Sequence, residues 1–124
     1  MAKRKAAAPG LTHLRITLSD DFYIGPGRAD LIELIAETGS IREAARRMGM
    51  SYKRAWGLVQ ALNEGLGAAL VETQRGGSGQ GAVLTAAGHE VLVRYRRMQQ
   101  LTREAIATDV KALTKLHSDM SKRK

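Results

Sequence analysis

A cluster of basic and amide side chains between residues 41 and 60 is the part of the sequence best suited to chemistry. Glu43 is the one acid in this stretch, and five bases surround it: Arg42, Arg46, Arg47, Lys53 and Arg54. Guanidinium and ammonium groups neutralise phosphates, and lysine or glutamine side chains such as Gln60 can also donate to base edges in the major groove of DNA. The available chemistry is recognition through charge and hydrogen bonds, and it favours double-stranded DNA as partner.

Two short helices with a tight turn between them are predicted to carry these side chains. Ser40, with Glu43 three residues later, has the pattern of a capping box, and Gly49 ends the first helix after about two turns. Ser51 is a second N-cap. At about 100° per residue, the second helix has an apolar side and a polar side. The apolar side holds Ala55, Leu58, Val59 and Leu62, and the polar side holds Lys53, Trp56, Gly57 and Gln60.

Small residues where the two helices cross favour a helix-turn-helix over a simple helical hairpin. Ala45, Gly49 and Ala55 would let the two backbones approach closely. The alternative is an ordinary hairpin whose outer face is solvated. In the helix-turn-helix, the second helix would enter the major groove, where Tyr52 and Trp56 offer apolar faces for a thymine methyl group or a sugar. For Trp56, packing against a neighbouring hairpin is the alternative.

The bulk composition limits the remaining possibilities. A chain of 124 residues has room for one domain, its lack of cysteine excludes disulfides and thiolate chemistry, and no apolar run approaches the ~18 residues of a membrane span. We therefore expect a cytoplasmic protein. The net charge is +8, and both ends are basic. Residues 1–11 and 118–124 are predicted to be a flexible basic arm and a basic tail, which follow a phosphate backbone or serve solubility.

Two shorter elements are predicted ahead of the basic cluster. Leu14, Ile16 and Leu18 alternate with polar residues, which indicates a strand with one solvated face that needs a partner. The next apolar residues recur at helical spacing and predict a first helix that ends at Gly39. These residues are Leu31, Leu34, Ile35 and Thr38.

A glycine-rich hairpin is predicted after the second helix of the pair, where Gly65 and Gly67 break the helical pattern. Residues 70–74 and 82–85 are the expected strands, and residues 75–81 the long tip between them. Backbone N–H groups of such a tip can lie against phosphates, as in the wing of a DNA-binding domain. A nucleotide-binding glycine loop is one rival, but its glycine spacing differs and it joins a strand to a helix. A hairpin tip without contacts is the other.

The last segment is predicted to be one long helix over residues 86–117, capped by Thr85. About 32 residues at 1.5 Å each span about 48 Å, whereas a body of the preceding ~85 residues is about 30 Å across. The far half therefore leaves its own domain, and the same helix of a second chain would cover its apolar stripe. Packing against the helix of residues 27–38 is the alternative for the near half. The expected dimerisation residues are Leu92, Tyr95, Met98, Leu101, Ile106, Val110 and Leu113.

Residues 31–92 resemble the winged helix-turn-helix of LysR-type regulators. The matching strings are Gly39-Ser40, Ala44-Ala45, Leu66-Gly67 and Leu84-Thr85-x-x-Gly88. Over residues 14–115 the chain also resembles the DNA-binding domain of ModE-type molybdate-responsive regulators, through Ser51-Tyr52-Lys53-Arg54-Ala55-Trp56, Asn63 and the glycine-rich residues 76–85.

The ModE-type resemblance implies a dimer built through the first and last helices and the N-terminal strand. It also implies that Ser51, Tyr52, Lys53 and Trp56 stand in the major groove. Members of that family hold molybdate in C-terminal β-barrel domains, whereas this chain ends at Lys124 without them. The resemblance therefore does not imply oxyanion sensing, and a stand-alone form and an excised domain both fit. A small-molecule effector is left open.

The sequence thus predicts a mostly α fold with a small β-hairpin: a winged helix-turn-helix over residues 12–117, including the wing at 70–85 and the dimerisation helix. The predicted function is that of a homodimeric, sequence-specific transcriptional regulator that binds an inverted repeat. A non-specific architectural DNA-binding protein and a winged-helix module that binds another protein are the alternatives. The expected DNA contacts are Arg42, Ser51, Tyr52, Lys53, Arg54, Trp56, Gln60, Arg75, Gly77, Ser78 and Gly79.

Enzymatic activity, a cofactor and a metal site are not expected. His13, His89 and His117 lie far apart in the sequence, and cysteine is absent. Neither a nucleophile with a nearby base nor a group of metal ligands can be assembled from these spacings.

Overall fold

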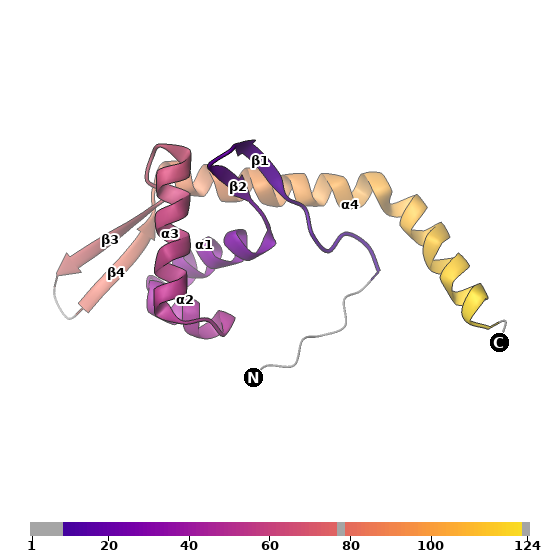
Figure 1. Ribbon diagram of the computed structural model, residues 1–124, viewed down its shortest axis with the longest axis horizontal. Coiled ribbons are helices and arrows are strands. Elements are labelled where there is room, and N and C mark those ends of the chain that lie inside the picture. The colour runs from indigo at the N-terminus through magenta and orange to yellow at the C-terminus, as the bar shows by residue number, and fades with distance from the viewer. Residues whose placement is uncertain (1–8, 77–78, 123–124) are drawn as a thin grey trace.

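The computed structural model describes residues 9–76 and 79–122. Four helices and two small antiparallel hairpins follow one another along this part of the chain (Figure 1). In chain order they are β1 (Ile16–Ser19), β2 (Phe22–Ile24), α1 (Pro26–Thr38), α2 (Ile41–Met48), α3 (Tyr52–Leu66), β3 (Val71–Gly76), β4 (Gly79–Leu84) and α4 (Ala86–Ser121). The mostly α fold with a small β-hairpin and a long C-terminal helix is confirmed.

The turn chemistry around α2 and α3 follows the sequence pattern. Ser40 Oγ accepts from the Glu43 backbone N–H at 3.0 Å, and Ser51 Oγ accepts from Arg54 N–H at 3.1 Å. Gly49 adopts φ 70°, the left-handed conformation that glycine tolerates best, and it ends α2. Only the reciprocal half of the capping box is wrong. The Ser40 N–H donates to Thr38 Oγ1 at 3.2 Å, and the Glu43 carboxylate accepts from Arg46 instead.

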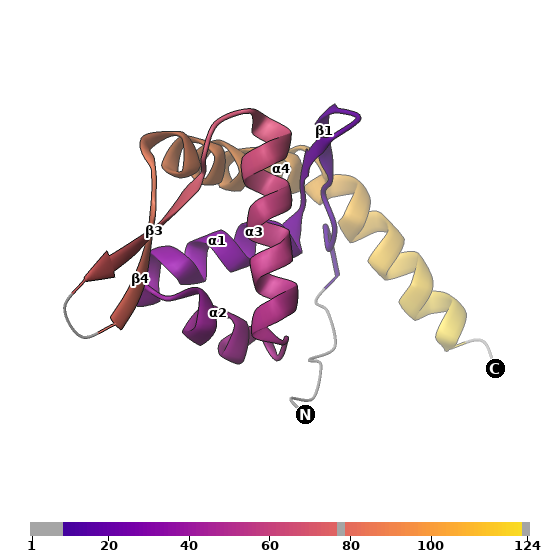
Figure 2. The ribbon, with the colours of Figure 1, turned by 60° about the vertical axis from the view of Figure 1, so that its left-hand side comes forward.

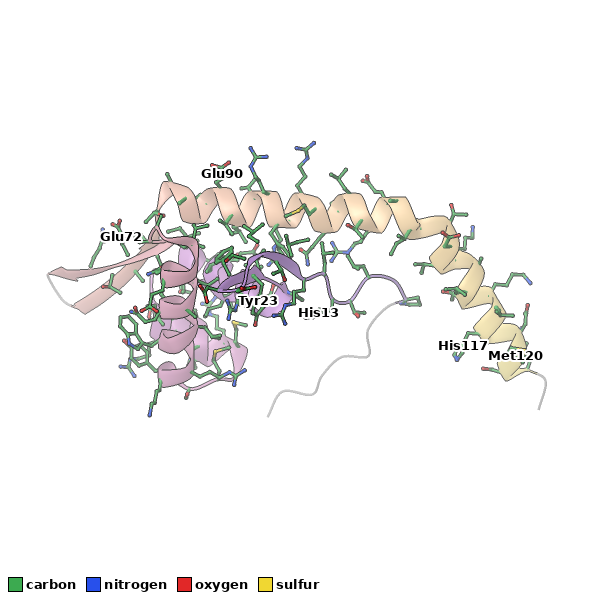
Figure 3. All side chains as sticks on the ribbon, turned by 45° about the horizontal axis from the view of Figure 1, so that its top comes forward. His13, Tyr23, Glu72, Glu90, His117 and Met120 are labelled. Atoms are coloured by element: carbon green, nitrogen blue, oxygen red, sulfur yellow. The ribbon has the colours of Figure 1, made fainter. Side chains whose placement is uncertain are left out.

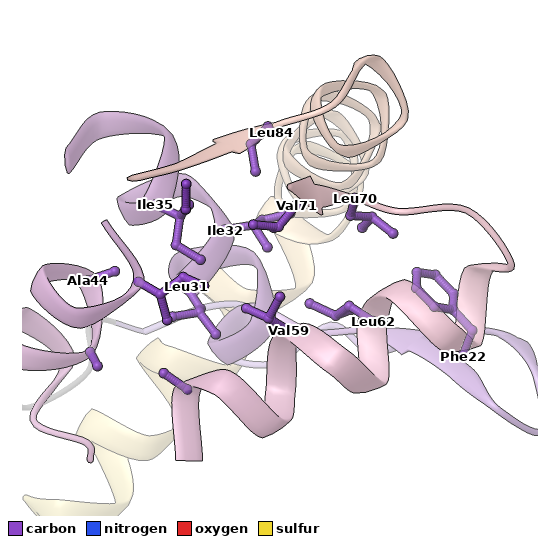
Figure 4. Close-up of a cluster of buried hydrophobic side chains, with 14 residues drawn as sticks. Phe22, Leu31, Ile32, Ile35, Ala44, Val59, Leu62, Leu70, Val71 and Leu84 are labelled. Atoms are coloured by element: carbon purple, nitrogen blue, oxygen red, sulfur yellow. The ribbon is translucent and has the colours of Figure 1, made fainter. Parts of the chain in front are cut away.

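The core lies between α1, α2, α3 and the part of the β3–β4 hairpin nearest the helices, where β3 begins and β4 ends (Figure 4). Its largest fully buried aliphatic side chains include Leu31, Ile32 and Ile35 of α1 and Leu62 of α3. The predicted inward side of α3 is confirmed, since Ala55, Val59 and Leu62 are buried and Leu58 packs against the cluster. The outward side of α3 is consequently fixed by burial of the opposite side.

Asn63 joins α3 to the root of the β3–β4 hairpin. Its Oδ1 accepts from the backbone N–H groups of Leu70 at 2.8 Å and Val71 at 3.2 Å, and its Nδ2 donates to the Val71 carbonyl at 3.0 Å. From the other strand, the Ala82 N–H donates to the Gly39 carbonyl at 2.9 Å. Both strands of the hairpin are therefore tied to the helices, one to α3 and one to the end of α1.

The β3–β4 hairpin is more regular than the sequence predicts. Its strands pair from Val71↔Leu84 to Gly76↔Gly79, so the expected long tip over residues 75–81 is wrong. Two residues, 77 and 78, remain between the strands, and they lie outside the described part of the chain. Backbone pairing needs no side-chain packing, which explains why a glycine-rich sequence can still form the ladder.

The partner of the N-terminal strand is β2, a three-residue strand that the sequence analysis did not predict. Phe22 and Ile24 point inward and are buried. The turn between the two strands lies so close to the end of α3 that a Cβ atom at Gly65 would overlap the Asp21 carbonyl. Gly65 therefore does not end α3 as predicted. The helix continues to Leu66, and Gly67 with φ 77° caps it.

Helix α4 has an inner half on the domain and an outer half beyond it (Figures 1 and 2). Thr85 caps it as predicted by accepting from Gly88 N–H at 3.0 Å, and it runs to Ser121, so residues 118–121 of the expected tail are helical. Tyr95 is fully buried within its own chain, beside Ile24 and Ala29. This placement corrects its assignment to dimerisation, and Leu92 and Met98 pack against the same buried cluster.

Candidate nucleic-acid interface

The first turns of α3 form an exposed cationic edge of the helix pair. Lys53 and Arg54 are exposed, and Trp56 keeps 38% of its surface accessible although a tryptophan side chain is mostly apolar. Ala55 between them is completely buried and anchors this turn. An anchored helix with an exposed lysine, arginine and indole can present donors and an aromatic face to a groove.

Arg42 and Tyr52 connect α2 to the start of α3. The Arg42 guanidinium lies 4.4 Å from the centre of the Tyr52 ring, a cation–π contact that holds both side chains in place. Next to them a small hollow of about 270 Å³ opens between the helix pair and the hairpin. It is lined by Ser40, Ile41, Arg42, Tyr52, Thr73, Gly81 and Ala82. Thr73 was not predicted from the sequence, because its position beside α2 depends on the docking of the hairpin.

Glu43 divides the five bases of residues 41–60 into two groups. Its carboxylate pairs with Arg46 at 2.6 Å and with Arg47 at 3.4 Å. The hydrogen bond from Arg46 is the largest cause that lowers the pKa of Glu43 below its ordinary value, so the acid is ionised at neutral pH. Arg46 and Arg47 are therefore partly neutralised on the surface of α2. Arg42, Lys53 and Arg54 carry the remaining charge.

The other predicted contact residues occupy varied positions. Ser51 is exposed, but its hydroxyl already serves as the cap of α3, and Gln60 is half-buried one turn beyond Trp56. The backbones of Arg75 and Gly79 belong to β3 and β4. Gly77 and Ser78 lie outside the described residues. The structure thus brings Arg42, Ser51, Tyr52, Lys53, Arg54 and Trp56 together at the ends of α2 and α3.

A second cationic group, which was not predicted from the sequence, surrounds Tyr23 of β2, with one arginine just ahead of β1 and one in the first turn of α1. The guanidinium groups of Arg15 and Arg28 lie 3.6 and 3.8 Å from the centre of the Tyr23 ring. Arg28 also donates to the Tyr23 carbonyl at 3.3 Å. Because β2 adjoins the far end of α3, this stack does not share the surface around Lys53. No sequence signal brings these three residues together, since their contact depends on the unforeseen strand β2.

Histidines and acids do not gather into a metal site in the described ranges 9–76 and 79–122. Figure 3 shows His13 beside the body of the domain near Tyr23, whereas His117 lies near the far end of α4. No helix in the same ranges is both long enough and apolar enough to span a membrane. The surface of α2, α3 and the β3–β4 hairpin is therefore the site that the chemistry singles out.

The arrangement of these elements defines a winged helix-turn-helix. Helices α2 and α3 are the helix pair, and the β3–β4 hairpin directly after them is the wing (Figure 2). Residues 29–89 match the model of the bacterial regulatory helix-turn-helix protein, lysR family. The chain belongs to this family.

Curated relatives share a long stretch of the sequence. The chain is 41% identical over 91 residues to the molybdenum-pterin-binding protein MopB of Rhodobacter capsulatus, a match that covers 73% of this chain and 34% of MopB. It is 36% identical over 93 residues to the DNA-binding transcriptional dual regulator ModE of Escherichia coli K12, covering 74% of this chain and 36% of ModE. The matched region spans about a third of the length of these relatives.

Solved structures agree with the family. The CbnR_DBD–DNA complex is similar with a TM-score of 0.56 and 31% identity, covering 70% of this chain and 95% of that one. Full-length CbnR complexed with its target DNA gives a TM-score of 0.52 and 30% identity, covering 67% of this chain and 27% of that one.

Proposed function

We propose that this chain is a sequence-specific DNA-binding transcriptional regulator whose helix α3 reads the major groove. The observation that carries the proposal is the exposed edge of α3, where Lys53 and Trp56 project from a turn anchored by buried Ala55. Support comes from the lysR-family match and from two similar structures that were solved with DNA.

Base reading is assigned to the first turns of α3. Lys53 can donate to guanine O6 and N7, and the faces of Tyr52 and Trp56 can contact a thymine methyl group or a sugar. Gln60 can contribute an amide donor further along the groove, and the Ser51 cap fixes where the helix begins. These contacts would give sequence discrimination, because base edges differ among the four pairs.

Phosphate contacts are assigned to the residues around α3. Arg42 and Arg54 flank its start, while Arg75, Gly77, Ser78 and Gly79 belong to the wing segment. Phosphate contacts raise affinity on any duplex and weaken it steeply with salt. In this proposal they set the register of α3 without adding sequence preference.

A second copy of the chain is proposed to pack on the outer half of α4. Leu101, Leu113, Leu116 and Met120 are large apolar side chains with at least half of their surface exposed, and Ile106 and Val110 are partly buried. At about 100° per residue, most of these side chains fall on one half of the helix surface. A two-fold dimer through this half would cover them and would place two α3 helices on an inverted repeat.

Selection of duplexes from a random pool tests the proposal. We expect an enriched sequence with two related half-sites in inverted orientation, and we expect the complex to survive competition with excess bulk genomic DNA. The mass of the complex in solution should correspond to two chains per duplex. The net charge of +8 favours one rival, an architectural protein that coats DNA. Enrichment of no sequence, with complete displacement by bulk DNA, would establish that rival.

Replacement of Lys53 by alanine is expected to weaken binding to the selected duplex by about 1–3 kcal/mol and to relax the preference at one base pair. The reason is the loss of a donor aimed at a base edge. Binding is measured on the selected duplex, on its single-base variants and on scrambled DNA. Arg54→Ala is the matched control, since loss of a phosphate contact should weaken all duplexes alike. Equal losses of affinity on selected and scrambled DNA for Lys53→Ala would show that Lys53 contacts a phosphate and not a base edge.

A further inference from the structure

Arg96 connects α4 to α1 at the point where α4 leaves the domain. Its Nη2 donates to Asp30 Oδ1 at 2.7 Å and its Nε to Glu33 Oε1 at 3.1 Å, both on α1, and its Nη1 donates to Gln99 Oε1 at 3.0 Å. Burial lowers the pKa of Arg96, but its hydrogen bonds to the Asp30 and Glu33 carboxylates, together with their negative charges, leave the pKa above its ordinary value. The guanidinium is thus held in one geometry by three acceptors.

The same network continues into the buried side of α4. Gln99 Nε2 donates to Tyr95 Oη at 3.3 Å, and Tyr95 Oη donates to the Leu14 carbonyl at 2.7 Å. Gln99 is only 6% exposed, and it is the one buried polar side chain found in the described ranges. Burial raises the pKa of Tyr95, so its hydroxyl remains a donor at neutral pH. The network therefore ties α4 to α1 and to the segment ahead of β1.

These residues stand at the last firm contact of α4 with its own domain. Gln99 is buried, whereas none of the α4 residues from Gln100 to Ser121 is buried. Tyr95 packs against Ile24 and Ala29, but apolar contacts are non-directional and leave the rotation of a helix weakly defined. The hydrogen bonds of Arg96 have preferred directions, and they therefore define the orientation of α4 relative to α1.

We propose that Arg96, together with Asp30, Glu33 and Gln99, is a positioning site that sets the direction of α4 and thereby the spacing between the two half-sites that the dimer accepts. This inference rests on the proposed function, because it takes the outer half of α4 as the dimer contact. The proposed partner groups are all within one chain, so the site is complete before DNA or a second copy binds.

The length of α4 makes its direction important for spacing. The 22 residues that follow Gln99, up to Ser121, extend about 33 Å at 1.5 Å each. A tilt of the helix axis by about 10° at Gln99 would displace the far end of α4 by about 6 Å, which is nearly two base pairs at ~3.4 Å each. In the dimer, a tilt of this size at Gln99 would move the two α3 helices relative to each other by a comparable distance.

The test compares Arg96→Met with Arg94→Met in the full chain. Arg94 lies on the same helix but pairs with Glu90, at an exposed position, rather than with α1. Dissociation constants are measured for a single half-site, for the selected pair, and for pairs with two base pairs inserted or deleted. For the unchanged chain and for Arg94→Met, we expect the selected spacing to be at least about tenfold tighter than the altered ones, because a rigid dimer must distort mis-spaced DNA.

For Arg96→Met we expect that spacing ratio to fall below about threefold while single half-site binding stays within about twofold. Arg96→Lys keeps the charge but not the three-way geometry, and it should restore the ratio only in part. Thermal melting reports whether each variant is folded. If Arg96→Met is not folded, Glu33→Ala, which removes one hydrogen bond of the three, takes its place in the comparison.

Two results would overturn the inference. One is an unchanged spacing ratio in folded Arg96→Met, and the other is an equal loss on single and paired half-sites, which would show a general role in the fold. A failure of the proposed function looks different, because the unchanged chain itself would then bind paired and single half-sites with the same affinity. That result would overturn both the proposed dimer and the role of Arg96 in setting the spacing.

Discussion

A chain that carries both Leu113→Asp and Leu116→Asp is expected to be monomeric and to bind the paired-site duplex about 100-fold more weakly or worse. Both residues are exposed, at 65% and 56%, so the substitutions remove little buried surface within the chain itself. In a dimer they would place two carboxylates per chain in an apolar interface, at a high desolvation cost. Without the second copy, each α3 binds its half-site alone and the gain from linked binding is lost.

Sedimentation gives the oligomeric state, and titration of single and paired half-sites gives the affinities. Ala107→Asp with Ser118→Asp is the matched control. It adds the same charge at two exposed positions of α4 that fall on the other half of the helix surface, at about 100° per residue. The control should remain dimeric. A Leu113→Asp, Leu116→Asp protein that still sediments as a dimer would show that the chains associate elsewhere.

Leu62→Ala is expected to reduce the free energy of unfolding by about 2–5 kcal/mol. Leu62 is fully buried on the inward side of α3, where it belongs to the cluster that also holds Phe22 and Leu70. Removing most of its side chain forfeits apolar burial and leaves a cavity in a region where three elements meet. A loss of this size is a large part of the stability of a small domain, which is about 5–15 kcal/mol.

Urea unfolding followed by circular dichroism measures the effect of Leu62→Ala. Glu64→Ala is the control on the same helix, since Glu64 is exposed and should change the free energy of unfolding by less than about 0.5 kcal/mol. Loss of Leu62 should also weaken DNA binding at temperatures where the variant is partly unfolded. A reduction below 1 kcal/mol would mean that the neighbouring side chains close the cavity.

The boundaries of the helix-turn-helix could be predicted because their signals are local. Ser40 and Ser51 cap their own helices, Gly39 and Gly49 adopt positive φ at the helix ends, and the inward side of α3 follows from periodicity. Each of these depends on residues within four positions in the sequence. The individual DNA contacts stay predictions, because exposure of a side chain such as Lys53 does not by itself choose a base or a phosphate.

The parts that could not be predicted depend on contacts between distant residues. Strand β2 is three residues long, too short for a periodic pattern, and it exists because it pairs with β1 and buries Phe22. Tyr95 matches the apolar stripe of a dimer helix, yet its hydroxyl reaches the Leu14 carbonyl, 81 positions earlier. Gly65 looks like a helix stop, but its role is to admit the Asp21 backbone.

The three hydrogen bonds of Asn63 have a practical consequence for engineering. They fix the wing to α3 from the inner side, through backbone groups of Leu70 and Val71 that are indifferent to residue type. Residues on the outer side of α3 can therefore be exchanged for those of another winged helix-turn-helix domain without readjusting the wing. Libraries randomised at Lys53, Trp56 and Gln60 should then yield altered operator preferences on an otherwise unchanged scaffold.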